Sequence, residues 1–269
     1  MEVTMEMIKN LREQSGAGIV DCKTALAEAS GDLTVAMEIL RKKGIAKAGK
    51  RAEREASQGV IKAWISPDQH RGHLMELRAE TDFVARNEQF QSLADNILQI
   101  LADHQPATLT ELLALPLGEQ TVGEAVDNMS GIIGEKIVLS DCATLVSQGT
   151  VAAYLHAAGS IGVLVAISRP EAGEVAKDIA MQIAANNPRY LTPDQVPMSE
   201  IGKEKEIYRE QLSQEGKPAE MIEKILEGKV SRYFTEVCLV KQEFIKDEKQ
   251  TVEQLLSGAV IEGYHRFKL

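Results

Sequence analysis

The feature that most constrains the fold is an internal repeat with a constant spacing of 90 residues. Two pairs of stretches show it: "GVIKAWI" from Gly59 matches "GTVAAYL" from Gly149, and "GHLMEL" from Gly72 matches "GVLVAI" from Gly162. Short apolar runs bounded by glycine predict β-strands, and two in succession predict a β-hairpin. A spacing that is kept across two strands indicates a duplicated unit. We therefore expect two copies of one hairpin.

The spacing continues into a helix that we expect after each hairpin. Four positions of the first helix fall on four of the second: Phe90, Leu93, Ala94 and Ile97 on Ala180, Ile183, Ala184 and Asn187. Intervals of three and four residues mark one face of a helix. Farther along, "TVGEAV" from Thr121 and "TVEQLL" from Thr251 each predict a helix start that leads into another strand. The repeat thus predicts a duplicated α/β core.

The second copy contains an insertion. Its "TVEQLL" lies 130 residues after "TVGEAV", which is 40 residues more than the hairpin spacing. The extra residues fall in the Lys- and Glu-rich stretch 196–240, which reads as helical on both sides of "EGKP". Gly216 suits the end of one helix, and Pro218 suits the first turn of the next. We expect an antiparallel helical hairpin of the coiled-coil type.

The first segment predicts three short helices joined by glycine turns. Asp21 and Asp32 are the N-cap candidates of the second and third helix. We expect this compact module to end near Gly44. The basic stretch "RKKGIAKAGKRAER", from Arg41 to Arg54, then reads most simply as a solvated, flexible linker, with a nucleic-acid patch as the alternative.

These patterns predict an α+β protein in four parts. The expected boundaries are residues 1–54 for the three-helix module and its linker, 55–147 for the first core repeat, 148–195 with 241–269 for the second, and 196–240 for the helical hairpin.

Charge and composition restrict the partners. The net charge of −10 produces a field that repels phosphate backbones. No apolar run approaches the roughly 20 residues of a membrane-spanning helix, and "MEVTMEMIKN" resembles neither a secretory signal nor an organelle presequence. Cys22, Cys142 and Cys238 form no CxxC pair, as expected for free thiols in a reducing compartment. We expect a cytoplasmic protein that binds neither membranes nor nucleic acid directly.

No catalytic constellation is visible. "GAG" at Gly16 lacks the strand, the third glycine and the lysine of a phosphate loop. His70 and His73 would face opposite sides of a strand, which argues against a metal site with Glu76. Serine and cysteine nucleophile patterns are also absent. We expect neither a cofactor nor a metal.

The hairpin "AYLHAAGSIGVLVAI" is apolar on both faces. This pattern indicates either a sheet that is covered on both sides or an interface. His156 lies in it beside Tyr154. A lone histidine of this kind is more often an ordinary satisfied side chain than a contact residue.

The corner "ETDFVARN" joins a predicted strand to a helix, and its residues Thr81, Asp82, Phe83 and Val84 allow two interpretations. Asp82 could cap the helix while Phe83, seven residues before Phe90, acts as a staple or first core residue. Alternatively, Phe83 is an exposed aromatic wedge that enters a partner. The second repeat has "RPEAGEVA" at this place, so the scaffold was duplicated without Asp82 and Phe83. This difference favours a wedge.

Two long stretches stand out, "SGAGIVDCKTALAEASGDLTVAMEILRKKG" and "AETDFVARNEQF". They resemble signatures of the elongation factor Ts family, the guanine-nucleotide exchange factors of the GTPase elongation factor Tu, and the resemblance covers essentially the whole chain. It implies a three-helix module similar to ubiquitin-associated domains, a duplicated core and a protruding coiled-coil hairpin.

The resemblance also implies the partner and the contact residues. The module would dock on the G domain of elongation factor Tu, with Arg12, Ile19, Val20 and Lys23 at the family's docking positions. Asp82 and Phe83 would push in beside the nucleotide and its magnesium, and the second repeat, including His156, would touch a distal domain. No covalent chemistry is implied.

The chain departs from the family pattern in two places. It ends at "YHRFKL", where many members continue through an acidic stretch into a final helix, and Ala79 replaces the family's usual cysteine. Two other interpretations remain: an interaction module that binds a different client, and an enzyme with a site between the repeats. A homodimer and a two-to-two complex also remain open.

Overall fold

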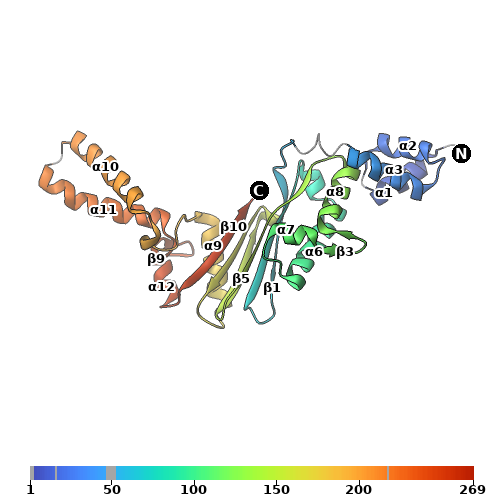
Figure 1. Cartoon of the computed structure of the whole chain (residues 1–269). Helices are drawn as coiled ribbons and strands as arrows, with labels where there is room; N and C mark the ends of the chain where they lie inside the picture. The colour runs from blue at the N-terminus through green and yellow to red at the C-terminus, as the bar shows by residue number, and fades with distance from the viewer. Residues whose placement is uncertain (1–2, 16, 47–52, 217) are drawn as a thin grey trace.

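The structure, a computed structural model, describes residues 3–15, 17–46, 53–216 and 218–269. Figure 1 shows a three-helix module at one end, a core of sheets and helices in the middle, and a helical hairpin at the other end. The predicted α+β class is confirmed. No helix within the described ranges combines the length and the apolar character that a membrane crossing requires.

The module consists of α1 (Met5–Ser15), α2 (Ile19–Glu28) and α3 (Leu33–Ala46). Asp32 caps α3 as expected, because its Oδ1 accepts from the amides of Thr34 at 2.8 Å and Val35 at 3.0 Å. Asp21 is not a cap: α2 already begins after the extended Gly18, so Asp21 lies in the first turn. Its charge there still favours the positive end of the helix dipole.

The module core is apolar and is contacted by one residue from outside the module. Its members are Ile8, Leu11, Ala17, Cys22, Ala25, Leu26, Ala29, Ala36 and Leu40, with Ile132 packed against them. Arg41 and Arg54, at the two ends of the basic stretch, are exposed as predicted, but these ends do not form a flexible linker. Helix α3 continues to Ala46, Arg41 Nε donates to Asn128 Oδ1 at 3.0 Å, and Arg54 forms an ion pair with Glu80. The middle of the stretch, 47–52, lies outside the described residues.

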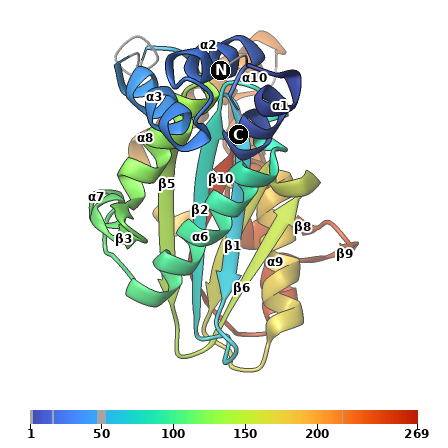
Figure 2. The ribbon, with the colours of Figure 1, turned by 90° about the vertical axis from the view of Figure 1, so that its right-hand side faces the viewer.

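The first core repeat is a three-stranded antiparallel sheet covered by helices. The sheet has the order β1 (Gln58–Ile65), β2 (Arg71–Ala79), β5 (Ile137–Val146). Between β2 and β5 lie α5 (Asp82–Ala85), α6 (Glu88–His104), α7 (Leu109–Ala114), the short strands β3 (Pro116–Leu117) and β4 (Gln120–Thr121), and α8 (Val122–Ile133). Figure 2 shows α6 lying across β1 and β2.

The second repeat has the same plan. Its sheet has the order β10 (Ile261–Lys268), β7 (Ile161–Ile167), β6 (Thr150–His156), and the 3₁₀ turn η1 (Ala157–Gly159) joins β6 to β7. Helices α9 (Gly173–Asn186) and α12 (Val252–Leu256) cover it, and β8 (Glu243–Phe244) pairs with β9 (Asp247–Thr251). Thr121 and Thr251 each open their helix with a capping box, as expected for equivalent positions.

The strand registers confirm the 90-residue repeat. Ile65 pairs with Gly72 in the first hairpin, and Leu155 pairs with Gly162 in the second. The predicted alignment of the two helices is confirmed for its first positions but not for its last. Phe90 lies in α6 and its counterpart Ala180 in α9, both buried, but Asn187 follows the end of α9 in a left-handed conformation and is exposed. The alignment ends there because α9 stops at Asn186, whereas α6 continues past Ile97 to His104.

The two sheets pack face to face. Gly72 and Gly162 mark this interface, because a Cβ on either would lie within 3.1 Å of two side chains of the opposite sheet and one of its own sheet. Those neighbours are Leu164, Ile65 and Val151 for Gly72, and Leu74, Leu155 and Ile61 for Gly162, two sets exchanged by the 90-residue spacing. The hairpin β6–β7 is therefore apolar on both faces because the first sheet covers one face and α9 the other.

The insertion is an antiparallel pair of helices, α10 (Met198–Gln214) and α11 (Ala219–Val237). Gly216, with φ +72°, provides the left-handed turn after α10, and Pro218 precedes α11 as its N-cap rather than lying in its first turn. At the base of the hairpin, the Glu200 carboxylate accepts from Tyr190 Oη at 2.8 Å and from the Tyr233 hydroxyl. The turns η2 (Pro193–Gln195) and η3 (Leu239–Lys241) flank the pair.

Candidate functional site

The corner that follows β2 is a helix of a single turn. Thr81 is the N-cap of α5, and its hydroxyl accepts from the Val84 amide at 3.4 Å. Helix α5 then ends, and Asn87 caps the next helix, α6, by accepting from the Gln89 amide at 2.8 Å. The interpretation of Asp82 as the cap is therefore wrong, because Thr81 takes that position in an extended conformation.

Adjacent side chains of the corner point in opposite directions. Val84 is 8% exposed and packs into the first-repeat core, whereas Phe83 is 83% exposed. No other large hydrophobic side chain of the described residues is as exposed. The interpretation of Phe83 as a staple or core residue is wrong. Phe83 lies in α5 and Phe90 in α6, so the two residues do not share one helical face. Asp82 is half-exposed and forms an ion pair with Arg86 at 3.1 Å.

Two carboxylates that the sequence did not single out hold the corner. Glu135 accepts from the Thr81 amide at 3.1 Å and from the Thr81 hydroxyl at 2.9 Å. Glu80 accepts from the Lys136 amide at 2.5 Å and from Arg54 at 3.1 Å. The feature that would have identified these carboxylates is the pairing of β2 with β5. Ala79 pairs with Ile137, so Glu80 and Lys136, the next residues beyond this pair, lie opposite each other.

The four predicted docking residues of the module are exposed. Arg12 lies on α1, and Ile19, Val20 and Lys23 lie on the first turns of α2, where Val20 is 76% exposed. Helical spacing sends the neighbouring Cys22 into the module core. The structure thus groups Ile19, Val20 and Lys23 on one short surface.

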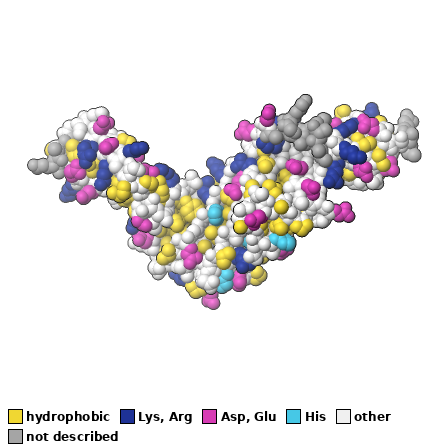
Figure 3. Space-filling view, viewed as in Figure 1, with side chains coloured by type: hydrophobic (Ala, Val, Ile, Leu, Met, Phe, Trp, Pro, Cys, Tyr) yellow, Lys and Arg dark blue, Asp and Glu magenta, His cyan; other side chains and the backbone are white. Residues whose placement is uncertain are grey.

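The module lies close to the corner. Gln89 Nε2, in the first turn of α6, donates to the carbonyl oxygens of Glu13 at 3.2 Å and Gln14 at 2.9 Å. The end of α1 therefore lies beside the helix that follows Phe83. On the face drawn in Figure 3, acidic and basic side chains are interspersed over the module and over the helical hairpin.

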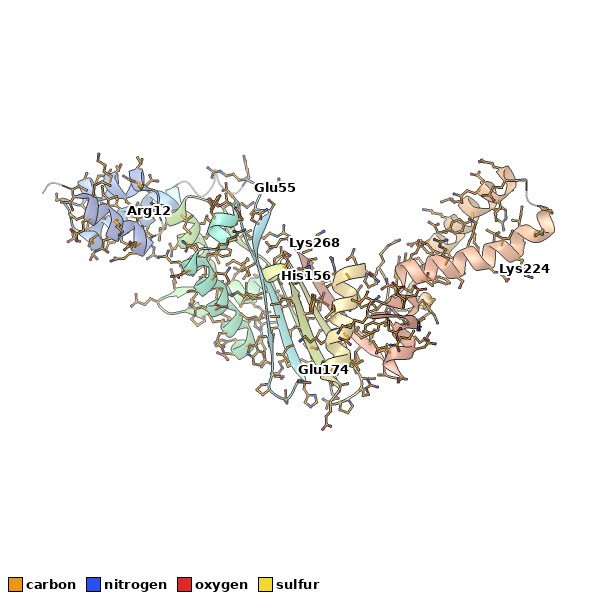
Figure 4. All side chains as sticks on the ribbon, turned by 180° about the vertical axis from the view of Figure 1, so that it is seen from behind. Arg12, Glu55, His156, Glu174, Lys224 and Lys268 are labelled. Carbon is orange, nitrogen blue, oxygen red and sulfur yellow. The ribbon has the colours of Figure 1, made fainter. Side chains whose placement is uncertain are left out.

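His156 ends β6 and is exposed, with Nδ1 3.0 Å from Tyr154 Oη. It lies at the same edge of the core as the corner. Ser160, just after η1, accepts from the Leu269 amide at 3.1 Å, and the adjacent Lys268 carbonyl accepts from Arg78 near the end of β2 at 3.0 Å. Figure 4 shows His156, Lys268 and Glu55 along this edge and Glu174 toward the opposite one.

Among the other polar groups of the described residues, those relevant to chemistry are the potential metal ligands and the thiols. Within the described residues, no three His, Cys, Asp or Glu side chains are placed to hold a metal ion. Burial raises the pKa of Cys142 and that of Cys238 to about 11, which leaves both as poor nucleophiles. A cleft of about 1180 Å³ lies at the edge opposite the corner, between the β1–β2 turn and the start of α9.

Comparison with known proteins gives one consistent family. The family model described as "Elongation factor TS" matches residues 80–269. The chain is 43% identical to "Elongation factor Ts" of Halothermothrix orenii, with 100% of this chain and 93% of that protein covered. The identity is 42% to that of a Nitratiruptor species, with coverage of 100% and 93%, and 41% to that of Clostridium perfringens, with coverage of 94% and 86%.

Proposed function

The chain belongs to the elongation factor Ts family, and we propose on this premise that it is a guanine-nucleotide exchange factor for elongation factor Tu. It binds the GTPase, disturbs the site that holds Mg²⁺ and GDP, and promotes GDP release during translation elongation. The proposal includes a cytoplasmic location, because translation elongation takes place there. No covalent step is involved.

The observation that carries the proposal is the presentation of Phe83. The Phe83 ring is 83% exposed, so the isolated protein does not gain the stabilisation that burying this apolar surface would give. Its neighbours are meanwhile fixed: Val84 is buried and Thr81 is clamped by Glu135. A partner that takes up the ring recovers that free energy, so the exposed ring is explained by use in a complex.

The mechanism follows from linkage. GDP is held by its phosphates, the loop around them and Mg²⁺. When Phe83 and the adjacent Asp82 carboxylate enter beside this site, they weaken nucleotide binding. The coupling is reciprocal, so GDP or GTP must weaken the binding of the exchange factor by the same factor and thereby release it. Each tenfold weakening corresponds to about 1.4 kcal/mol of coupling.

The other predicted contacts would provide docking. The apolar pair Ile19 and Val20, flanked by Arg12 and Lys23, offers a small surface for the G domain. His156, at the same edge as the corner, would contact a distal domain. In this arrangement the module and second repeat supply affinity, and the corner between them supplies exchange.

The test is release of a fluorescent GDP analogue from elongation factor Tu. We expect catalytic amounts of the wild-type protein to accelerate release, and Phe83→Ala to slow the accelerated rate by about tenfold or more, or at least about 1.4 kcal/mol. Binding of the variant to nucleotide-free elongation factor Tu should fall less, because docking lies elsewhere. Val260→Ala is the matched control, a 62% exposed apolar residue next to β10 at the opposite edge.

Two outcomes would contradict the proposal. Equal losses of docking and exchange in Phe83→Ala would make Phe83 an ordinary contact residue. No acceleration by the wild-type protein, with a GTPase that responds to another exchange factor, would favour the alternative of an interaction module for a different client, which the exposed Ile19 and Val20 also fit.

A further inference from the structure

We propose that Glu135 is a positioning residue that holds the α5 corner so that Phe83 projects in one fixed direction, with Glu80 as a second support. The inference rests on the proposed exchange function and deepens it. Neither carboxylate would need to contact the partner nucleotide. Both would act through Phe83.

The corner needs external support because α5 has only four residues. A single helical turn fixes several backbone dihedrals in return for one or two hydrogen bonds, so it is unstable by itself. Phe83 cannot stabilise the turn either, since its ring is exposed and packs against nothing in the described core. The direction of the ring therefore depends on what holds the backbone on either side.

Glu135 provides the strongest hold on the N-terminal side. One carboxylate engages both the amide and the hydroxyl of Thr81, at 3.1 Å and 2.9 Å. Because the acceptor is ionised, these hydrogen bonds are stronger than neutral ones. The same hydroxyl also caps α5 through the Val84 amide. Glu135 thus fixes the residue that begins the turn.

Glu135 is itself held in place. It follows Gly134, whose φ of +87° ends α8 in a left-handed turn. Its carbonyl oxygen accepts from Ser130 Oγ at 2.7 Å. The carboxylate is therefore presented by the end of a 12-residue helix that packs in the first-repeat core. Through this chain of contacts, α8 supports the corner.

Glu80 connects the corner to the same turn from the other side. It accepts from the Lys136 amide, and from Arg54, which also donates to the Gly134 carbonyl at 3.4 Å. Lys136 Nζ in turn donates to the Arg54 carbonyl at 2.8 Å. Residues 80–81 and 134–136 thus form two reciprocal links between the corner and the end of α8. On the C-terminal side of Phe83, burial of Val84 completes the support.

This arrangement predicts a specific kinetic effect. A ring that is held in advance loses little conformational freedom when it enters the partner, so more of its interaction is available for displacing the nucleotide. If the hydrogen bonds between Glu135 and Thr81 are removed, the protein should still dock through its other surfaces. The exchange rate at saturating exchange factor should fall instead.

The experiment measures GDP release against exchange-factor concentration for Glu135→Ala and Glu135→Gln. We expect Glu135→Ala to lower the saturating rate by about tenfold, equivalent to about 1.4 kcal/mol, with little change in the half-saturating concentration. Glu135→Gln keeps an oxygen for the Thr81 amide and should recover part of the rate. Glu119→Ala, an exposed carboxylate in the β3–β4 turn, is the control.

The same variants in a Phe83→Ala background identify how Glu135 acts. A residue that works through Phe83 should have almost no further effect once the ring is absent. Equal losses in both backgrounds would overturn the positioning role in favour of a direct contact or a general structural defect. An unchanged rate in Glu135→Ala, while Phe83→Ala is slow, would overturn it without touching the exchange function.

A second measurement does not depend on exchange activity. The amides of Ala85 and Arg86 donate to Thr81 and Asp82 carbonyls within the corner, at 3.2 Å and 3.1 Å. Glu135→Ala should speed hydrogen exchange at these two amides while amides in the core strands remain protected. Unchanged protection at the corner would refute the clamp even if the proposed function itself failed.

Discussion

Phe83 and Val84 are neighbours in the chain with opposite surroundings. Both are apolar, yet one is 83% exposed and the other is 8% exposed. The difference comes from α5, because successive positions of a helical turn face different sides. Only one of the two can face the sheet, and Val84 does. The residue that remains outside is the one to which we assign exchange.

His73 allows a prediction about pH at the scale of a single residue. It is fully buried beside Trp64, with Nδ1 2.9 Å from Thr144 Oγ1, and its Nε2 has no hydrogen-bond partner among the described residues. Burial, together with the charge of Arg71, lowers the pKa of His73 from 6.5 to about 4. The folded protein therefore resists protonation that the unfolded chain accepts.

The free energy of unfolding should therefore decrease as pH falls. The stability contribution of neutral His73 is complete above its unfolded pKa and is lost as pH falls from there toward about 4, by about 1.4 kcal/mol per pH unit. Between about pH 7 and about pH 5, the free energy of unfolding should fall by roughly 2 kcal/mol more in the wild type than in His73→Gln. Urea titrations at both pH values measure this. Equal pH dependence in the two proteins would contradict the assignment.

At the scale of elements, glycine marks the close approaches inside each hairpin. A Cβ at Gly149 would lie 2.1 Å from the Ile167 carbonyl oxygen, and one at Gly59 would lie 2.2 Å from the Leu77 carbonyl oxygen. These are equivalent positions of the repeat. The same close approach at both indicates that the hairpin geometry was kept along with the sequence.

We therefore expect Gly149→Ala to destabilise the protein by about 1–3 kcal/mol, because backbone atoms must move to admit the methyl group. Gly228→Ala is the matched control: Gly228 lies within α11 with open space around its Cβ position, so alanine should gain about 1 kcal/mol of helix propensity. Urea unfolding measures both changes. An unchanged free energy of unfolding in Gly149→Ala would show that the backbone of the β6–β7 hairpin can move to admit a methyl group at little cost.

At the scale of the whole molecule, the helical hairpin has two separate apolar clusters. The outer cluster is formed by Leu212, Ile222 and Leu226, and the one at the base includes Val196, Tyr233 and Val237. The base is also joined to the core, where the Tyr190 amide donates to the Val237 carbonyl at 3.0 Å. Among the described residues, the outer cluster includes no residue of the two sheets.

Replacing residues 205–231 by a short glycine–serine linker should leave the core folded and keep the base cluster. In our proposal the partner-contact surfaces lie in the module, at the corner and in the second repeat at His156, so acceleration of GDP release should stay within about threefold, or less than 1 kcal/mol, of the wild type. Circular dichroism and the release assay test this together. A large loss of exchange in a folded variant would show that the outer hairpin takes part in binding.

The sequence by itself determined the periodic features of the fold. The 90-residue spacing predicted two equivalent hairpins, and the matching stretches from Thr121 and Thr251 predicted the starts of α8 and α12. Gly216 and the charged stretch around it predicted the inserted pair of helices. These signals are local, because turns, caps and helix faces depend on residues only a few positions apart.

Tertiary structure decided which apolar surfaces are covered and which groups hold the candidate site. Residue spacing alone left Phe83 as either core or wedge, because an interruption between two short helices has no strong local signature. The links from Glu135 to Thr81 and from Arg54 to Glu80 join residues 54 and 26 positions apart in the chain. The first link forms only once β2 and β5 are paired, and the second once β1 and β2 are paired. Side chains distant in sequence are brought together by this packing and not by local preference.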